Sequence, residues 1–420
     1  MENQKSPELR FNGFNENWEQ SNFLDNIQSI IDFRGRTPKK LGMDWSKDGY
    51  LALSALNVKN GYIDPKIDAH YGDEKLYQKW MAGNELKKGQ VLFTTEAPMG
   101  NVAQVPDDRG YILSQRTIAF NVKANKISDD FLAVLLGSPN VFNTLSGLSS
   151  GGTAKGVSQK SLSGLEVIFA QDLAEQEQIG EFFQNLDQSI ALHEKKLAQT
   201  QNFKKAMLEK MFPKHGSKRP EIRLKGFSGD WDQHELGQHS EMFNGDRGVN
   251  YPSSDDMVKV GIPFINAGDL EDGRVNLQNA NKITRYKYNQ LNGAKIKFGD
   301  IVYCLRGTLG KNAFIDNFNE GTVASSLVVI RPKNILGAYL FQVLNTDIEF
   351  RQRTLCDEGA AQPNLSAKNL AGFMIPVPSI EEQKAIGCFF NKLDETLNLQ
   401  QQQLQTLKNL KQAFLEKMFV

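Results

Sequence analysis

Cysteine is scarce in this chain, and nothing indicates a metal site or a disulfide framework. Among its 420 residues the three cysteines, Cys304, Cys356 and Cys388, lie far apart and form no CxxC pair, so neither a disulfide-stapled fold nor a zinc site is indicated. No stretch approaches the roughly 18 to 20 apolar residues of a membrane helix, and the polar first residues do not resemble a signal peptide. We therefore expect a soluble, cytoplasmic protein of a reducing compartment.

A surplus of positive charge is also missing. Lysine plus arginine and aspartate plus glutamate number 49 each, and the balance is local, with 19 basic and 20 acidic residues in 1–172. A domain that binds nucleic acid alone usually carries a basic surplus. Neutrality therefore counts against simple DNA binding, unless basic loops gather on one face or a partner supplies phosphate contacts.

Catalytic motifs are lacking as well. Residues 147–151 (Gly-Leu-Ser-Ser-Gly) match the G-x-S-x-G elbow of α/β-hydrolases, but that motif needs a strand before it and a helix after it. Here a helix-like segment precedes it and a Gly/Ser-rich loop follows. Residues 307–312 lack the spacing of a phosphate loop, no methyltransferase or nuclease motif occurs, and His234 and His239 do not have a convincing metal-ligand spacing. The residues predict a protein that is not an enzyme and that itself binds no metal or cofactor.

The chain does contain a long internal repeat. The motif at 7–14 with Trp18 returns at 220–227 with Trp231, and 18 of the 40 residues in 173–212 are identical in 380–419. Both copies end on Leu-Glu-Lys-Met-Phe, at 208–212 and 415–419. A duplicated unit of this length is a whole domain with its connector rather than a short solenoid repeat. Two like halves suggest a target with two like halves.

Each half divides into a β-rich globular part and a helix. Short apolar runs predict strands at 91–93, 117–122 and 165–169, matched by 301–303, 327–330 and 373–375, with one amphipathic helix each at 128–145 and 335–352. In the helical segments, apolar residues step by alternating threes and fours, the pattern of a coiled-coil seam. The seam residues are Ile179, Phe183, Leu186, Ile190 and Leu197 in the first helix and Ile386, Phe390, Leu393, Leu397, Leu404 and Leu407 in the second.

Connectivity predicts the direction of these helices. The second globular part joins the end of the first helix to the start of the second, and domain termini tend to lie close together. The helices should therefore run antiparallel, with the globular parts at opposite ends of a rod and a pseudo-twofold axis between them. A helix of about 35 residues is roughly 50 Å long. If the two globular parts bound DNA, such a rod could place them about one turn of the duplex, roughly 34 Å, apart.

Several motifs carry a resemblance to a known family. They are Gly13-Phe14 with Trp18, residues 299–302 running into Arg-Gly-Thr-Leu-Gly at 306–310, Gln-Pro-Asn-Leu-Ser at 362–366 leading to 375–378, and Glu-Glu-Gln at 381–383. Over essentially the whole chain the sequence resembles the specificity subunit of type I restriction-modification systems, the HsdS family. The first half departs from the pattern at 94–100 and 153–158, which affects individual contacts rather than the family.

The resemblance implies an α/β (α+β) fold with two similar β-rich target recognition domains joined by two long antiparallel coiled-coil helices. It places the first recognition domain at 1–172, the central helix at 173–213, the second domain at 214–379 with a linker at 214–219, and the distal helix at 380–420. It also implies a non-catalytic subunit that reads a bipartite DNA target for two methyltransferase subunits and for restriction subunits. S-adenosylmethionine, ATP and Mg²⁺ would be used by those partners, not by this chain.

Loops in which hydrogen-bond donors meet glycine supply the candidate DNA contacts, because Arg on guanine and Asn or Gln on adenine are the natural major-groove pairs. The candidates in the first domain are Arg34, Arg36, Thr37, Lys39, Lys40, Gln115, Arg116 and Lys155. Those in the second are Arg247, Asn250, Arg306, Thr308, Ser325, Ser326, Gln362 and Asn364. Each of them could instead be an ordinary turn or surface residue; their matching placement in two diverged halves favours the group.

The helices offer candidate partner contacts. Phe182 and Phe389 lie one residue before a seam phenylalanine and widen the apolar stripe, so we expect a partner subunit to dock there. His193 and Gln400 occupy equivalent seam positions, where fixing the register is the favoured role of a polar residue and binding a ligand is the alternative. The alternative function for the chain is a two-headed protein-binding scaffold without DNA specificity, which the neutral charge would suit.

Overall fold

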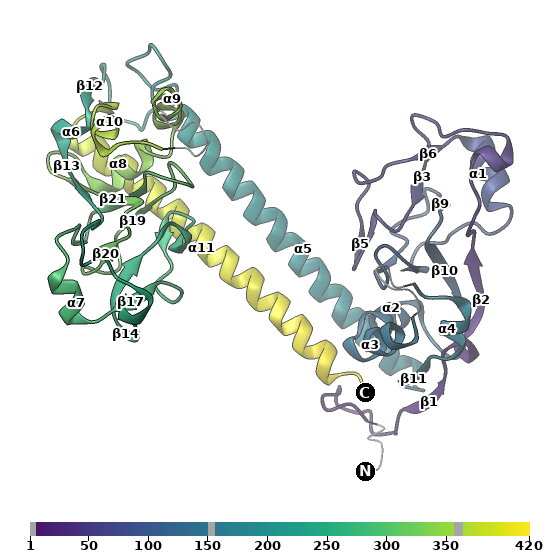
Figure 1. Ribbon diagram of the computed structural model, residues 1–420. Helices are drawn as coiled ribbons and strands as arrows, with labels where there is room; N and C mark the ends of the chain where they lie inside the picture. The colour runs from purple at the N-terminus through teal and green to yellow at the C-terminus, as the bar shows by residue number, and fades with distance from the viewer. Residues whose placement is uncertain (1–5, 150–155, 357–363) are drawn as a thin grey trace. The chain divides into compact units, whose positions relative to one another are not determined.

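The computed structural model describes residues 6–149, 156–356 and 364–420, and these fold into two compact units (Figure 1). Unit 1 comprises residues 1–195 and 402–420, and unit 2 comprises residues 196–401. The last segment of the chain thus belongs to the first unit. Each unit contains part of both long helices, α5 (Leu173–Lys210) and α11 (Ile380–Lys417).

Unit 1 is built on a four-stranded sheet of order β2-β10-β7-β8 and a three-stranded sheet of order β6-β3-β9, in which β3 and β9 are parallel. A two-stranded pair β1-β11 and a hairpin β4-β5 complete it. The strands are β1 (Glu19–Asn22), β2 (Ile27–Asp32), β3 (Tyr50–Leu53), β4 (Val58–Lys59), β5 (Tyr62–Ile63), β6 (Tyr71–Gly72), β7 (Val91–Thr94), β8 (Val102–Gln104), β9 (Ile112–Leu113), β10 (Thr117–Val122) and β11 (Glu166–Phe169). Its shorter helices are α1 (Glu74–Met81), α2 (Asp129–Gly137), α3 (Pro139–Leu148) and α4 (Gln159–Ser163).

Unit 2 repeats this plan, with sheets β13-β21-β18-β19 and β17-β14-β20, a pair β12-β22 and a hairpin β15-β16. The parallel pairing recurs between β14 and β20. The strands are β12 (Asp232–Glu235), β13 (Ser240–Asn244), β14 (Met257–Ile265), β15 (Leu270–Glu271), β16 (Arg274–Val275), β17 (Asn281–Ile283), β18 (Ile301–Cys304), β19 (Asn312–Phe314), β20 (Thr322–Val323), β21 (Leu327–Pro332) and β22 (Met374–Val377). The helices are α6 (Leu236–His239), α7 (Arg285–Gln290), α8 (Gly337–Val343), α9 (Asp347–Leu355) and α10 (Ala367–Ala371).

The repeated opening motif fastens each domain to the start of its long helix. In unit 1 the Nε and Nη2 of Arg10 donate to the two carboxylate oxygens of Glu175 at 2.5 and 2.7 Å. The Glu175 side chain is 1% exposed. The next residue, Gln176, donates to the carbonyls of Lys126 and Ala170 and accepts from the amide of Ser128. A carboxylate in the first turn is also favoured by the helix dipole.

The same contacts recur in unit 2. Arg223 donates to Glu382 through Nε and Nη2, both at 2.7 Å, and Gln383 donates to the carbonyl of Pro378 and accepts from the amide of Leu336. The motifs that stand twice in the sequence are therefore structural. They hold α5 and α11 against the globular parts of the two units.

One expectation from the sequence is wrong in each unit: the single helices predicted at 128–145 and 335–352 are each two helices. Ser138 ends α2 and caps α3 through its hydroxyl, and Pro139 at the first position of α3 has no N–H to donate. In unit 2, α8 ends at Val343, and the Thr346 hydroxyl caps α9. Apolar spacing continued across both breaks, but cap residues decided where each helix began.

The long helices pair antiparallel within each unit. In unit 1, Asp187 forms an ion pair with Lys411 at 2.5 Å and Glu194 with Lys408 at 2.6 Å. Residue numbers therefore rise along α5 in the direction in which they fall along α11. In unit 2, Lys204 meets Asp394 at 2.5 Å. The pairs Asp187–Lys411 and Asp394–Lys204 are equivalent positions of the repeat. The predicted fold class, with two similar domains on two long antiparallel helices, is confirmed.

Among the described residues, no single helix is long and apolar enough to cross a membrane. The bent pair α2 and α3, which meet at 68°, passes the test together by length and composition. Several of its apolar residues, including Phe131, Leu135 and Leu145, are buried in the core of unit 1, whereas Phe142 and Leu148 are each 40% exposed.

Candidate nucleic-acid interface

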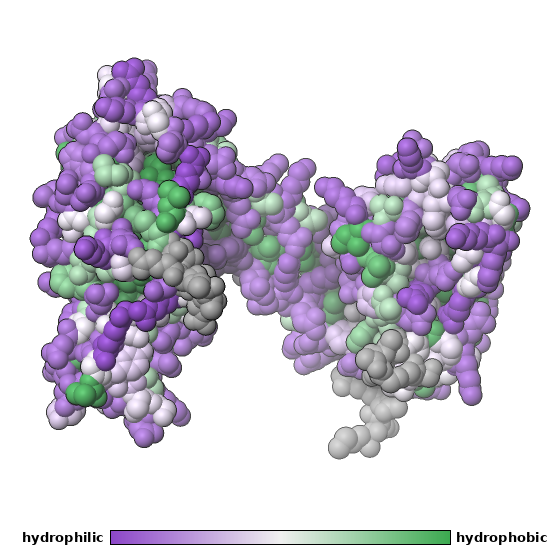
Figure 2. All heavy atoms as spheres, turned by 45° about the horizontal axis from the view of Figure 1, so that its top comes forward, coloured by the Kyte–Doolittle hydropathy of each residue, from purple (hydrophilic) through white to green (hydrophobic). Residues whose placement is uncertain are grey.

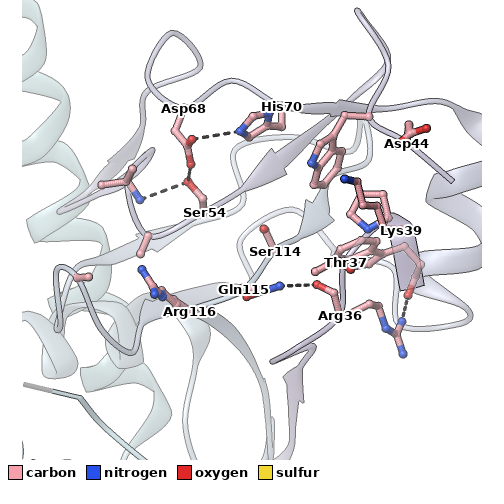
Figure 3. Close-up of a pocket in the computed structure, with 16 residues that line it drawn as sticks. Arg36, Thr37, Lys39, Asp44, Ser54, Asp68, His70, Ser114, Gln115 and Arg116 are labelled. Carbon is pink, nitrogen blue, oxygen red and sulfur yellow. Dashed lines mark hydrogen bonds and ion pairs between the residues drawn. The ribbon is translucent and has the colours of Figure 1, made fainter. Parts of the chain in front are cut away.

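A cavity of about 430 Å³ in unit 1 is lined by five of the predicted DNA contacts of the first domain, but not by Arg34 or Lys40. Figure 3 shows Arg36, Thr37 and Lys39 at one end of it and Arg116 towards the other, with Gln115 between them. They come from the loop after β2 and from the residues before β10. The two groups of candidates lie about 80 positions apart in the sequence. They come close in space because β2 and β10 are neighbouring strands of one sheet.

Some of these side chains shape the loop. Arg36 donates to the carbonyl of Trp80 and lies 4.2 Å from the centre of the Phe33 ring. The Gln115 amide donates to the carbonyl of Arg36 at 2.7 Å, and the Lys40 ammonium donates to the carbonyl of Gly35 at 2.7 Å. The Thr37 hydroxyl accepts from the amide of Lys40 at 3.3 Å. These contacts fix the loop, so its specific geometry is set before any ligand arrives.

Other side chains point outward. Lys39 is exposed, and Arg34 is half exposed beside Asp32 at 3.6 Å. Arg116 is 56% exposed and forms an ion pair with Glu96 at 3.0 Å. Lys39 is therefore placed to meet an anionic ligand, whereas Arg34 and Arg116 each lie beside a carboxylate. Lys155, also predicted, lies outside the described residues.

The opposite wall of the cavity holds residues that the sequence analysis missed. The Ser54 hydroxyl donates to Asp68 at 2.6 Å, and His70 lies 3.3 Å from the other oxygen of that carboxylate (Figure 3). Trp45 stacks on His70 with ring centres 5.5 Å apart. None of these four residues stands in a glycine-containing basic loop, so the donor-plus-glycine signal could not find them.

In unit 2 the predicted residues meet at the corresponding place. Arg247 donates to the carbonyl of Ser325 at 3.1 Å, and the Nε of Arg306 donates to the Asn364 side chain at 3.0 Å. The backbone amide of Leu305 donates to Ser326, which links the two groups. The Asn250 amide donates to the carbonyl of Gln290 at 3.3 Å. Gln362 lies outside the described residues.

The loop that carries Arg247 is held by a buried carboxylate. Asp246 accepts from the backbone amides of Gly248, Asn292 and Gly293 at 2.7 to 3.3 Å, and these hydrogen bonds lower the pKa of its carboxyl. Next to this loop, Val249 is fully exposed. Its apolar side chain is of the kind that contacts a thymine methyl group, and composition alone gave no reason to single it out.

The loop that carries Arg306 stands on a packed polar base. The Cys304 thiol donates to the carbonyl of Arg306 at 2.9 Å and lies 3.6 Å from the Thr308 hydroxyl. Beneath it, the Tyr303 hydroxyl and the Arg353 Nε both donate to Glu349. Burial raises the pKa of the Glu349 carboxyl above its usual value, and the two donors oppose that rise. Thr308 is thus tied to the base of the loop, whereas Arg306 remains exposed.

The helix positions divide into two groups. Ile179, Phe183, Ile386 and Phe390 lie in the hydrophobic cores of the two units. The other predicted seam residues are half-buried or, for Leu404, 9% exposed: Leu186, Ile190, Leu197, Leu393, Leu397, Leu404 and Leu407. Of the polar seam residues, His193 contacts the carbonyl of Ser189 at 2.8 Å and Gln400 is buried.

The predicted partner contacts Phe182 and Phe389 are half-buried by contacts inside the chain. Phe182 meets the rings of Phe11 and Phe414, with centres 5.8 and 5.0 Å apart. Phe389 meets Phe203 at 6.4 Å. More exposed apolar residues stand elsewhere on the helices. They are Leu192 at 64%, Leu399 at 55%, Phe203 at 47% and Leu410 at 43%.

The described residues offer no assembled catalytic centre of the kinds considered from the sequence. The motif at 147–151 begins in α3, so a helix and not a strand precedes its serine. In the ranges 6–149, 156–356 and 364–420, no group of three metal-ligating side chains is found. His234 and His239 share a contact of 2.7 Å between Nδ1 and Nε2, and no third ligand accompanies them among these residues.

Comparison with known proteins bears directly on this interface. The family described as "Type I restriction modification DNA specificity domain" matches twice, at residues 15–202 and 229–409. The EcoBI specificity subunit of Escherichia coli is 27% identical over 178 residues, which are 41% of this chain and 37% of that protein. The putative MjaX specificity subunit of Methanocaldococcus jannaschii is 24% identical over 420 residues, covering 95% of this chain and 92% of that one.

Two solved structures share the fold. The S subunit of a type I restriction-modification system from M. genitalium superposes with a TM-score of 0.66 at 17% identity and covers 99% of both chains. A chain from a structure of assembly and conformational transition in a type I system gives a TM-score of 0.53 at 17% identity, covering 96% of this chain and 97% of that one. Because the family matches 15–202 and 229–409, well over half of the residues, this chain belongs to the type I restriction-modification DNA specificity family and carries two copies of its domain.

Proposed function

We propose that this chain is the non-catalytic specificity subunit of a type I restriction-modification complex and reads a bipartite DNA target. Residues 1–172 would read one block and residues 214–379 the other, while 173–213 and 380–420 serve assembly. The complex would act in the cytoplasm and direct adenine methylation and restriction by its other subunits. Those subunits, not this chain, would use S-adenosylmethionine, ATP and Mg²⁺.

The observation that carries the proposal is the repeated convergence of the same segments. In each unit the loop after the first strand of the four-stranded sheet, the loop after β7 or β18, and the residues before β10 or β21 come together with exposed arginines. An arginine fork is the commonest reader of guanine. The exposed cations Lys39, Arg247 and Arg306 bear on the objection from overall neutrality, whereas Arg34 and Arg116 are each paired with a carboxylate. The scaffold alternative lacks comparable support, because the matched family is one of DNA specificity.

We further propose that two copies of the methyltransferase subunit bind. The exposed apolar residues Leu192 and Leu399 are 207 positions apart, as are Phe203 and Leu410, so each unit presents one residue of each pair. Figure 2 shows hydrophobic side chains along the helices among hydrophilic ones. A repeated surface is suited to two copies of one partner. Leu399→Lys should release one copy and Leu192→Lys the other, as native mass spectrometry would count; loss of both copies from either single change would contradict two equivalent sites.

The test of DNA reading uses Arg306 in the complete complex. Arg306→Ala should reduce binding to the second half-site by about 10- to 100-fold in a way that depends on one base pair, because one bidentate contact is worth roughly 1–3 kcal/mol. Binding to single-base variants of the first half-site should keep the wild-type pattern. The measurement is affinity on a panel of single-base variants at two salt concentrations.

A matched control is Arg285→Ala, which removes an exposed arginine paired with Glu320 in the same unit. It should leave the base preferences unchanged. If Arg306→Ala weakened binding to every sequence equally and flattened the salt dependence, Arg306 would be a phosphate contact. Specific binding would then need another reader.

A further inference from the structure

The loop after β7 and the loop after β18 are the same piece of structure in the two units, held by matching backbone hydrogen bonds. In unit 1 the backbone amides donate from Thr95 to Arg116 at 2.8 Å, from Val157 to Thr95 at 2.8 Å and from Gly100 to Thr94 at 2.9 Å. The corresponding bonds in unit 2, in the same order, run from Leu305 to Ser326 at 2.9 Å, from Leu365 to Leu305 at 3.0 Å and from Gly310 to Cys304 at 3.1 Å. Isolated bridges also correspond, Glu96 with Gly156 and Arg306 with Asn364.

This match equates Glu96 with Arg306 and Arg116 with Ser326. Unit 1 therefore carries an acid where unit 2 has its arginine, and an arginine where unit 2 has a serine. Each unit keeps one guanidinium at this place, supplied from opposite sides of the same backbone contact. Sequence alignment by position alone hides the relation, because it pairs Arg306 with a carboxylate.

Each guanidinium group has one oxygen close to its Nε: Arg306 donates a hydrogen bond to Asn364, whereas Arg116 and Glu96 form an ion pair. The Nε of Arg116 lies 3.0 Å from a Glu96 oxygen, and the Nε of Arg306 lies 3.0 Å from the Asn364 oxygen. Among the described residues, no hydrogen-bond acceptor is found for the Nη atoms of either arginine. An arginine held through Nε presents its terminal fork, which matches the O6 and N7 atoms of guanine.

The position of Arg116 is also conformationally costly. Its backbone φ is +66°, one of five positive values at non-glycine residues that the structure describes, and two more, Asp68 and Ala97, line the same cavity. L-residues pay a steric penalty in this region, and such residues gather at functional sites. An exposed ion pair with Glu96 contributes too little to stability to account for this strain.

We infer that the base-reading arginine comes from different segments in the two domains: it precedes β10 in the first domain and follows β18 in the second. Arg116 does in the first domain what Arg306 does in the second, and Glu96 is the positioning residue that aims it. This inference rests on the proposed function. Glu96 also cancels the charge of Arg116, which weakens its attraction to phosphate and leaves the base edge as its partner.

The test measures two quantities that a merely structural ion pair would not move together. In the complete complex, Arg116→Ser should reduce discrimination at one base pair of the first half-site by about 10- to 100-fold and leave the second half-site unchanged. Glu96→Ala should reduce discrimination at the same base pair, while affinity for unrelated DNA rises and the salt slope steepens by about 1, because the released arginine contacts phosphate.

Two further variants sharpen the test. Glu96→Gln keeps an oxygen for Nε, as Asn364 does in unit 2, and should retain most of the discrimination. Arg109→Ser removes an 80% exposed arginine of unit 1 that is also paired with a carboxylate, and should change nothing.

The inference is overturned if Glu96→Ala raises affinity equally for all sequences with discrimination unchanged, or if Arg116→Ser weakens all sequences alike. A wild-type complex that prefers no sequence at all would instead reject the proposed function itself. The two failures are therefore distinguishable.

Discussion

The ion pair between Arg223 and Glu382 should be a major stabilising contact of unit 2. The Glu382 side chain is 2% exposed and accepts two hydrogen bonds from Arg223, whose side chain is 17% exposed. Glu382→Ala leaves the guanidinium largely buried without its counter-charge. Breaking a buried pair in this way costs about 3–5 kcal/mol, and the residual exposure of Arg223 favours the lower end, about 3 kcal/mol.

That cost can be measured as a melting temperature. Unit 2 spans residues 196–401, and for a unit of this size each kcal/mol lowers Tm by about 2–4 °C. Glu382→Ala should therefore lower the Tm of unit 2 by about 6–12 °C in calorimetry. Hydrogen exchange should place the loss of protection around Arg223 and in the first turns of α11, because Glu382 links them.

The control and the counterpart come from the same chain. Glu320→Ala breaks an exposed pair with Arg285 and should shift Tm by no more than about 2 °C. Glu175→Ala should reproduce the large effect in unit 1 because the repeat reproduces the contact. A Glu382→Ala protein that melts within 1 °C of the wild type would refute the reasoning.

Three further outcomes are expected. The double variant Leu197→Asp, Leu404→Asp places unpaired charges at equivalent seam positions outside the domain cores. The methyltransferase subunits should then no longer co-purify with the chain, while circular dichroism keeps the strand signal. An intact complex would contradict the seam assignment. Exchanging residues 220–379 for those of a relative should change one block of the methylated target and keep the spacer, as methylome sequencing would show, and a change in both blocks would contradict independent reading. Burial, with the Asp130 carboxylate, raises the pKa of Asp129 to about 6, above the unfolded value of about 3.9. The folded state then binds more protons between these pH values, so the free energy of unfolding falls as pH rises from about 4 to about 6. In urea unfolding, Asp129→Asn should remove that fall and increase the free energy of unfolding at pH 7.5 by about 1 kcal/mol, allowing for partial exposure. An unchanged pH profile in the variant would count against this assignment.

The parts of the fold that repeat in sequence were predictable. Period and length located α5 and α11 within a few residues, and short apolar runs found strands such as β7 and β18, because these signals depend on local geometry. The break at Ser138 was missed because apolar spacing ran on through it. Phe183 and Phe390 satisfied the seam period but lie in domain cores, which periodicity alone cannot distinguish from a helix interface.

The candidate interface was predictable only in part. Basic residues beside glycine were found, but which of them remain exposed depends on tertiary contacts, such as the Trp80 carbonyl that engages Arg36. The equivalence of Arg116 and Arg306 could not be read from the sequence either. It depends on a backbone hydrogen bond that joins residues 21 positions apart in each unit.

The return of the chain end to unit 1 has a consequence for synthesis on the ribosome. Leu415, Met418 and Phe419 belong to the core built around Trp18, so that core stays incomplete until these residues have been synthesised. At about 5–20 residues per second, the delay after residue 195 is about 10 to 45 s. During this delay the nascent chain already carries the other copy of Leu-Glu-Lys-Met-Phe, at 208–212. Met211 and Phe212 of that copy pack in unit 2 in the folded protein. The order of emergence thus offers the first core an identical segment before its own arrives.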